Sequence, residues 1–403
     1  MKVKGKKIIL TPVVLLTVNA IGVSSPYAST LVNCKTTGIY ESDIFCGRGT
    51  DTSGSRNSVV IGNDIFIPKI VVPGKDGIEQ TIAIGSNIQS TGDNSIVIGN
   101  DSISGKTGAI ALGGDDAAGT YNANGKGYML RAFGSNPYGN SLDYYRANAA
   151  FGDGAISLGA NSQALADGAI SIGAAATSGD GTQSGIAWNS ASGKQSIALG
   201  AESSALKDNS MALGYRTQAI GISSIAVGNN AAARDSNATA LGANAQASGE
   251  NSLAIGNSSK ATAINTISIG TGNIVSGNNS GVIGDPSTVS GENTYSLGNN
   301  NTVSANHAFV LGNSVNNSVD NSVVLGNDST VTPPVATPEY TVNGTSYKLA
   351  GSTPVSTVSI GGIGKERTLT NVASGRVLAT STDAVNGSQL FAITSEVEKG
   401  NRF

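Results

Sequence analysis

Few side chains in this sequence have the types and spacing that catalysis requires. The chain contains one histidine, His307, so a Ser-His-Asp triad could be built only on that residue. The run Gly113–Asp116 contains two adjacent aspartates, but the glycine–aspartate nonapeptide of calcium-binding β-rolls does not recur. The other carboxylates are scattered, whereas polysaccharide cleavage needs clustered ones. We therefore expect no enzymatic activity, no metal site and no cofactor.

Two cysteines, Cys34 and Cys46, lie close together near the N-terminus. In an exported chain such a pair usually forms a disulfide, and a metal site would need more ligands than this region offers. We predict a disulfide, with two unpaired thiols as the alternative.

The first residues predict export. Four lysines precede a mostly apolar run, residues 8–23, and small residues follow it. This order is typical of a signal peptide, which we place at residues 1–28. A short membrane anchor is the alternative, although the run is short and interrupted by polar residues. Residues 29–56 then form an N-terminal segment that carries the cysteine pair.

The composition limits the kinds of partner. Glycine supplies 54 residues, charged residues only 13%, and the formal net charge is −3. This balance provides no basic patch, so we expect no nucleic-acid partner. The chain also differs from a disordered polymer, because aliphatic residues recur in it at regular intervals.

A fourteen-residue repeat dominates the sequence. A glycine closes a short aliphatic phrase, always at the same interval, at positions 200, 214, 228, 242, 256, 270, 284, 298, 312 and 326. The same spacing joins Gly85 to Gly99 and Gly113, and Gly159 to Gly173, while Gly62 ends an isolated relative. A fixed period of this kind is the signature of a repeat architecture.

Each repeat alternates with period two. A branched aliphatic residue precedes the closing glycine and a second large apolar residue usually stands two positions earlier, as Leu253 and Ile255 do before Gly256. Alternation predicts a strand. The middle of the unit alternates as well, so each unit holds two short strands and two turns. Since fourteen residues are too few for a strand–helix–strand unit, each repeat should form one coil of a parallel solenoid.

The residue between the two large aliphatic ones should point to the opposite side of the strand. It is usually small and apolar, as at Ala212, Ala226, Ala240 and Ala254. A solvent-facing strand would carry polar residues there. If the larger residues fill the coil, these alanines must pack against another chain, so we assign them to an oligomer interface. An alanine-rich free surface is the alternative.

Asparagine recurs in the turn before the aliphatic phrase, at positions 209, 237, 251, 265, 279, 293 and 321. Asn tolerates tight turns, and stacked Asn side chains could form a ladder of amides. His307 falls in the same column, which favours a turn role over a catalytic one.

The repeats resemble those of a known family. The phrases "NSVVIG" (Asn57–Gly62), "NSLAIG" (Asn251–Gly256) and "NSVVLG" (Asn321–Gly326) resemble the head repeats of trimeric autotransporter adhesins of the YadA type. Residues 364–390, "GKERTLTNVASGRVLATSTDAVNGSQL", resemble the neck of the same family.

The resemblance implies an all-β fold, a left-handed parallel β-roll solenoid of 14-residue repeats, homotrimeric, followed by a neck and the start of a parallel coiled coil. The trimer seam of that coiled coil would include Leu390, Ile393 and Val397. The expected organisation is a head at 57–330 with insertions at 114–154 and 174–195, a β-hairpin connector at 331–357, a neck at 358–389 and the start of the stalk at 390–403.

The insertion at 114–154 is rich in aromatic residues. Insertions in solenoids emerge as loops that often bind ligands, and Tyr is a favoured interface residue. We therefore assign ligand contact to Tyr121, Tyr128, Tyr138, Tyr144 and Tyr145. A loop that packs only on itself is the alternative.

By resemblance, the chain should be a virulence-related adhesin on the outer membrane of a Gram-negative bacterium. Its expected partners are collagen, fibronectin or laminin, and like fibres on other cells through autoaggregation. No anchor strands follow residue 403, so a secreted chain is an alternative localisation. A structural surface fibre or coat component without a dedicated ligand is the alternative function.

Overall fold

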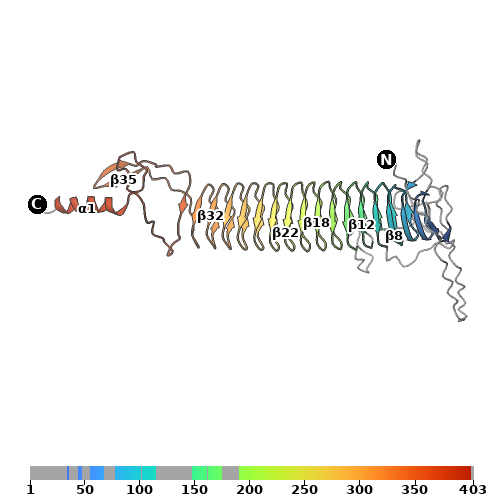
Figure 1. Ribbon diagram of the computed structural model, residues 1–403. Helices are drawn as coiled ribbons and strands as arrows, with labels where there is room; N and C mark the ends of the chain where they lie inside the picture. Colours follow the sequence, from blue (N-terminus) through green and yellow to red (C-terminus); the bar gives the residue numbers. More distant parts are fainter. Residues whose placement is uncertain are drawn as a thin grey trace, which may run out of the picture.

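The computed structural model describes residues 34–35, 44–47, 55–67, 78–100, 102–114, 148–160, 162–174 and 190–400. These residues form a long rod of stacked coils, followed at the C-terminal end by a connecting segment and one helix (Figure 1). The predicted signal peptide lies outside the described residues.

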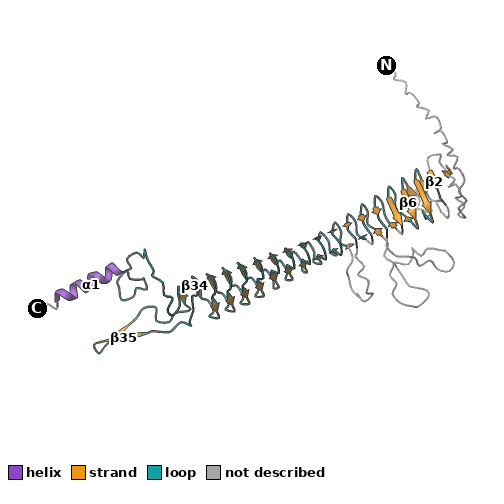
Figure 2. Cartoon of the chain, turned by 90° about the horizontal axis from the view of Figure 1, so that it is seen from below, coloured by secondary structure: helices purple, strands orange, loops and turns teal. Residues whose placement is uncertain are grey.

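Two sheets run along the rod, and most coils contribute one strand to each (Figure 2). The larger sheet, sheet A, contains 19 strands: β1 (Cys34–Lys35), β2 (Ile44–Cys46), β4 (Val59–Asn63), β6 (Ile82–Ser86), β8 (Ile96–Asn100), β10 (Ile110–Leu112), β12 (Ile156–Leu158), β14 (Ile170–Ile172), β16 (Ile197–Leu199), β18 (Met211–Leu213), β20 (Ile225–Val227), β22 (Thr239–Leu241), β24 (Leu253–Ile255), β26 (Ile267–Ile269), β28 (Gly281–Ile283), β30 (Tyr295–Leu297), β32 (Phe309–Leu311), β34 (Val323–Leu325) and β37 (Val358–Ser359).

The smaller sheet, sheet B, contains 14 strands: β7 (Gln89–Ser90), β9 (Ser102–Ser104), β11 (Asn148–Ala150), β13 (Gln163–Ala164), β15 (Ser190–Ala191), β17 (Ser204–Ala205), β19 (Gln218–Ala219), β21 (Ala232–Ala233), β23 (Gln246–Ala247), β25 (Lys260–Ala261), β27 (Ile274–Val275), β29 (Thr288–Val289), β31 (Thr302–Val303) and β33 (Asn316–Asn317). A short pair, β3 (Ser55–Arg56) and β5 (Ile78–Glu79), lies near the N-terminus.

The strand register follows the repeat. Leu253 pairs with Ile267 and Ile255 with Ile269, so each coil lies on the next with a shift of fourteen residues. All the pairings within sheet A are parallel except that of β1 with β2, and neighbouring strands in such a sheet lie about 4.8 Å apart. The predicted parallel β-solenoid of 14-residue coils is confirmed.

Small residues fill the interior of each coil. Ala212, Ala226, Ala240 and Ala254 are 0% exposed in the isolated chain and belong to its hydrophobic core. Their assignment to an oligomer interface was therefore wrong. Two strands of one short coil face each other so closely that only small side chains fit between them, and the large aliphatic residues turn outward.

The core changes along the rod. Alanines fill most of it up to Ala261, whereas valines such as Val275, Val289 and Val303 take the corresponding places in the C-terminal coils. Buried hydroxyls complete the interior by bonding to the turns: Ser224 Oγ donates to the carbonyl of Gly221 at 2.7 Å. Ser210, which follows Asn209 in an "NS" phrase, makes the same kind of bond to the carbonyl of Lys207, so these serines satisfy the backbone of their own turns.

The closing glycines are required by the stacking. Gly256 has a φ of 120°, and a Cβ added there would lie 2.2 Å from the carbonyl oxygen of Gly270 in the next coil. Only a residue without a side chain can adopt that conformation and allow so close an approach.

The N-terminal end of sheet A closes with an antiparallel pair. Strands β1 and β2 place Cys34 opposite Cys46, and Cys46 is disulfide-bonded. This antiparallel strand ends the stack of parallel coils.

The solenoid resumes after the hairpin near its C-terminal end. Strands β35 (Glu339–Val342) and β36 (Thr345–Lys348) form an antiparallel hairpin around the Asn343-Gly344 turn, and β37 then pairs in parallel with β34. Residues 358–361, "VSIG", repeat the aliphatic phrase, and the inserted hairpin displaces them from the fourteen-residue period. Val358 pairs with Val323, so this last strand lies 35 residues after β34. The fourteen-residue interval did not predict it for that reason.

The neck is held by side-chain amides and one arginine pair. Gln389 accepts a bond from the backbone N–H of Gly375 at 2.9 Å and donates to its carbonyl at 2.6 Å. Arg376 bonds both carboxylate oxygens of Asp383, at 2.7 and 2.9 Å, and this contact holds the pKa of Asp383 below its usual value. Helix α1 (Gly387–Gly400) follows.

Candidate functional site

The outer side of sheet A is a continuous apolar surface, which we call the apolar face. It consists of the residues one and three positions before each closing glycine. They remain solvent-accessible in the isolated chain even though they are large, for example Met211 36%, Leu241 44%, Ile283 51%, Phe309 43% and Leu311 48%. A soluble protein rarely leaves so long an apolar surface uncovered, so this face is a candidate surface for contact with another molecule.

Helix α1 has the same character. None of its residues is buried, and Leu390, Ile393 and Val397 are 59%, 52% and 58% exposed. Their spacing of three and four residues places them on one side of the helix. The three residues assigned to the coiled-coil seam therefore have the exposure and spacing that such a seam needs, and their partners remain a prediction.

The Asn column forms the ladder that its repetition suggests. The side-chain amide of Asn237 donates to Asn251 at 3.0 Å, Asn251 donates to Asn265 at 3.1 Å, and Asn265 donates to Asn279 at 2.9 Å. All four have φ near 55°, in the left-handed region that Asn tolerates better than most residues.

His307 stands in that column. Its φ is 55°, and its Nε2 lies 3.4 Å from the side-chain nitrogen of Asn293 in the preceding coil. The histidine thus acts as a rung of the turn column. Among the residues that the structure describes, no group of three or more His, Cys, Asp or Glu side chains is placed to hold a metal ion.

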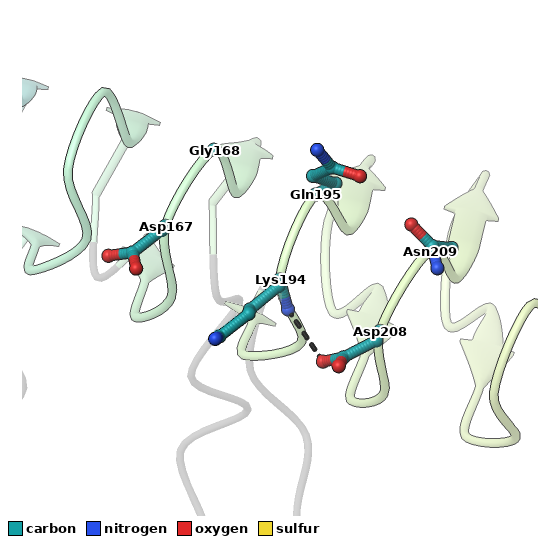
Figure 3. Close-up of a pocket in the computed structure, with 6 residues that line it drawn as sticks. All are labelled: Asp167, Gly168, Lys194, Gln195, Asp208 and Asn209. Atoms are coloured by element: carbon teal, nitrogen blue, oxygen red, sulfur yellow. Dashed lines mark hydrogen bonds between the residues drawn. The ribbon is translucent and has the colours of Figure 1, made fainter.

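A shallow pocket lies on the same turn edge. It is lined by Asp167, Gly168, Lys194, Gln195, Asp208 and Asn209, which stack along three successive coils (Figure 3). The backbone N–H of Lys194 donates to Asp208 Oδ1 at 2.9 Å. Asp167 accepts one hydrogen bond from the backbone N–H of Asp153 and a second from Lys106 Nζ. These two bonds hold the pKa of Asp167 below its usual value. These contacts tie coil to coil.

One charged cluster was missed by the sequence analysis. Glu202 is almost fully buried, and it accepts bonds from Arg216 Nε at 2.6 Å and from the Tyr215 hydroxyl at 3.2 Å. The guanidinium also lies 4.9 Å from the centre of the Tyr215 ring. The signal available in the sequence was the opposite charge of Glu202 and Arg216 at the same turn position of two successive repeats, a position that in the next five repeats carries Asn, Ser, Gly or Pro.

The predicted ligand contacts Tyr121, Tyr128, Tyr138, Tyr144 and Tyr145 lie outside the described residues. Within the described part of the chain, no helix is long and apolar enough to cross a membrane.

The fold and the apolar face define a rod-shaped β-solenoid followed by a neck and a helix with one apolar side. Family comparisons agree. The profile "YadA head domain repeat (2 copies)" matches residues 90–115, 152–176, 191–217, 219–245, 247–273 and 290–314. The profile "Coiled stalk of trimeric autotransporter adhesin" matches residues 368–403.

A curated relative is the autotransporter adhesin BtaE of Brucella suis, which is 56% identical over 64 residues. That match covers 16% of this chain and 9% of the relative's length. The chain thus carries the head repeats and the stalk segment of YadA-type trimeric autotransporter adhesins, and the resemblance predicted from its sequence is confirmed.

Two solved structures are locally similar. One is the C-terminal YadA-like domain of a Burkholderia pseudomallei protein, with 35% identity, a TM-score of 0.23, and coverage of 30% of this chain and 50% of the other. The second is the collagen-binding domain of the Yersinia adhesin YadA, with 21% identity, a TM-score of 0.24, and coverage of 56% and 97%. TM-scores this low describe local likeness only.

Proposed function

We propose that this chain is the head of a surface adhesin that works as a homotrimer and attaches bacteria to host extracellular matrix. The observation that carries the proposal is the apolar face on coils that belong to an adhesin repeat family. Burying a large aliphatic side chain gains about 1.5–3 kcal/mol, and this face repeats such side chains in nearly every coil.

A second and a third copy of the chain are the partners that fit this face. The face is straight and periodic, so only a surface with the same fourteen-residue period can cover it coil by coil. The seam residues Leu390, Ile393 and Val397 would continue the same interface into a coiled coil.

The ligand would meet the surfaces that trimerisation leaves free. These are the outer side of sheet B, the turn columns and the insertions, including the five tyrosines assigned above. Three identical copies on each fibre and many fibres on each cell would multiply weak contacts through effective concentration. Collagen, fibronectin and laminin are the proposed ligands, and contact between like fibres would give autoaggregation.

Light scattering and surface binding test the proposal on the full chain. We expect a mass of three chains and saturable binding to at least one immobilised matrix protein. Tyr144→Ala and Tyr145→Ala should each weaken that binding several-fold and leave the trimer intact. Tyr340→Ala, in the exposed hairpin, is the matched aromatic control. A trimer that binds none of the three proteins would favour the structural fibre instead.

A further inference from the structure

Two rows of turn residues border the apolar face. The leading edge is the position six residues before each closing glycine, at the start of the sheet A strand. The trailing edge is the position two residues after that glycine, at the end of the strand. On the trailing edge, the described residues carry a formal charge at four positions only: Asp64, Glu202, Arg216 and Asp328.

The leading edges of three of those four coils carry the opposite charge. Arg56 stands in the coil of Asp64, Lys194 in that of Glu202, and Asp208 in that of Arg216. In each of these coils the two ends of one strand have opposite signs.

The fourth coil does not follow this rule. Its edges carry Asp320 and Asp328, which have the same sign. Lys365 Nζ lies 2.9 Å from Asp328 Oδ2 and neutralises that carboxylate, so the trailing side of this coil carries no net charge.

The matching charges cannot meet within one chain. Lys194 and Glu202 lie at opposite ends of β16, whose three residues alone span about 10 Å. Within each edge the charges already alternate: Lys194 is followed by Asp208, and Glu202 is bonded to Arg216. The opposite charges at the two ends of one strand therefore do not stabilise the isolated chain.

A cyclic trimer brings the two edges together. In a parallel cyclic trimer the interfaces are head-to-tail, so each copy contacts one neighbour through its leading edge and the other neighbour through its trailing edge. Here the leading edge of one copy faces the trailing edge of the next at the same height, because the rotation contains no shift along the axis.

We propose that Asp208 of one copy pairs with Arg216 of the next, while Lys194 lies beside the Glu202–Arg216 pair of that copy, and that this four-charge cluster sets the axial register of the trimer. The inference rests on the proposed homotrimer. The apolar face discriminates weakly between registers, because a large aliphatic residue recurs directly before the closing glycine of every coil. A slip of one coil would place Lys194 against Arg216, or Asp208 against Glu202, and like charges oppose such a pairing.

Arg216, Asp208 and Lys194 have the exposure this role requires, whereas Glu202 acts through Arg216. Glu202 is 4% exposed and its own Arg216 covers it, while the Arg216 side chain is 48% exposed and bonds that carboxylate through Nε and Nη2. Asp208 and Lys194 are both exposed on the leading edge. Arg216 can thus bond its own Glu202 and the Asp208 of a neighbour together.

Thiol cross-linking of the full chain measures the register. Ser236→Cys with Asn244→Cys places one thiol on each edge of a single coil and reports the aligned trimer. Ile222→Cys with Asn244→Cys is the matched control that reports a slip of one coil. With the natural charges, a short bismaleimide should join neighbouring copies efficiently in the first pair and several-fold less in the second.

Charge reversal then tests the cause. Lys194→Glu with Asp208→Lys should lower cross-linking of the aligned pair several-fold, and adding Glu202→Lys with Arg216→Glu should restore it. If the reversed variant remains a trimer with unchanged cross-linking, the register proposal is overturned while the trimer stands. An unmodified chain that is monomeric by light scattering would overturn both.

Discussion

At the scale of the residue, backbone conformation explains most of the repeated turn chemistry. The turn before each sheet A strand holds a residue with φ near 55°, and that residue is Asn in most coils. Asn reaches this region at lower cost than other residues with side chains, because its amide bonds to the local backbone. Gln195, Ser223 and His307 occupy the same conformation and carry more strain than Asn would.

Replacing His307 with Asn should therefore stabilise the solenoid. The expected gain is about 0.5–1 kcal/mol per chain, since the strained residue is removed and the Asn293 amide regains a ladder partner. Thermal unfolding followed by circular dichroism should show a higher melting temperature. His307→Ala is the matched control and should lower it. A melting temperature that falls in the Asn variant would contradict this account of the column.

Period-two alternation predicted the sheet A strands of the glycine-closed repeats but not which side of each strand faces inward. In an ordinary half-buried strand the larger residues face the core, and by that rule Ile255 would lie inside. The structure places Ala254 inside, because the two strands of a fourteen-residue coil lie too close for larger side chains. Burial of one side is thus confirmed for the small residues, and the covering of the other side by another chain stays a prediction that now concerns the large residues.

At the scale of the element, the last coil is closed by a side chain from the neck. Arg367 donates to the carbonyls of Asn327 and Ile360 at 2.7 and 2.8 Å, and to Ser329 Oγ at 3.0 Å. These acceptors lie at the C-terminal end of the stack, where no further coil follows to bond them.

Arg367→Ala should loosen that end without unfolding the rod. We expect amide hydrogen exchange to rise several-fold in β34 and β37, and to stay unchanged in β24, because local opening costs less when the bonds across the end are lost. Arg376→Ala removes a pair within the neck itself and is the matched control. Equal protection of β37 in both variants would show that Arg367 does not close the stack.

The connector could be predicted only in part. An Asn-Gly turn between alternating residues gave the hairpin, since that turn type favours two-residue loops. Strand β37, which follows the hairpin, was not predicted, because an insertion moves it out of the fourteen-residue interval. Glu202 and Arg216 were hidden for a different reason: their contact joins two coils and depends on stacking that a single repeat does not show.

At the scale of the whole molecule, the apolar face decides how the chain exists in solution. A rod with a large hydrophobic flank along its length should either pair with copies of itself or aggregate. The same reasoning separates two kinds of variant, since changes inside a coil affect folding and changes on the face affect assembly.

The triple variant Leu241→Asp, Ile255→Asp and Ile269→Asp should prevent trimer formation and leave the coils folded. It loses about 1.5–3 kcal/mol of burial for each side chain and introduces charges that face one another across the interface. Light scattering should report single chains, while circular dichroism retains the β signal.

The matched control is Ser276→Asp, Ser290→Asp and Ser304→Asp, which adds the same charge on exposed turn positions beside sheet B. This control should remain a trimer. Ala254→Asp, by contrast, buries an unpaired carboxylate inside a coil and should lower the melting temperature sharply. A triple face variant that still weighs three chains would remove the apolar face from the assembly.

The shift of fourteen residues from coil to coil also bears on how such a chain can evolve. Deleting one unit shortens the rod by about 4.8 Å, duplicating one lengthens it by the same amount, and the strand register of the remaining coils is kept. The length of the rod can therefore change by gain or loss of whole units without a change of fold.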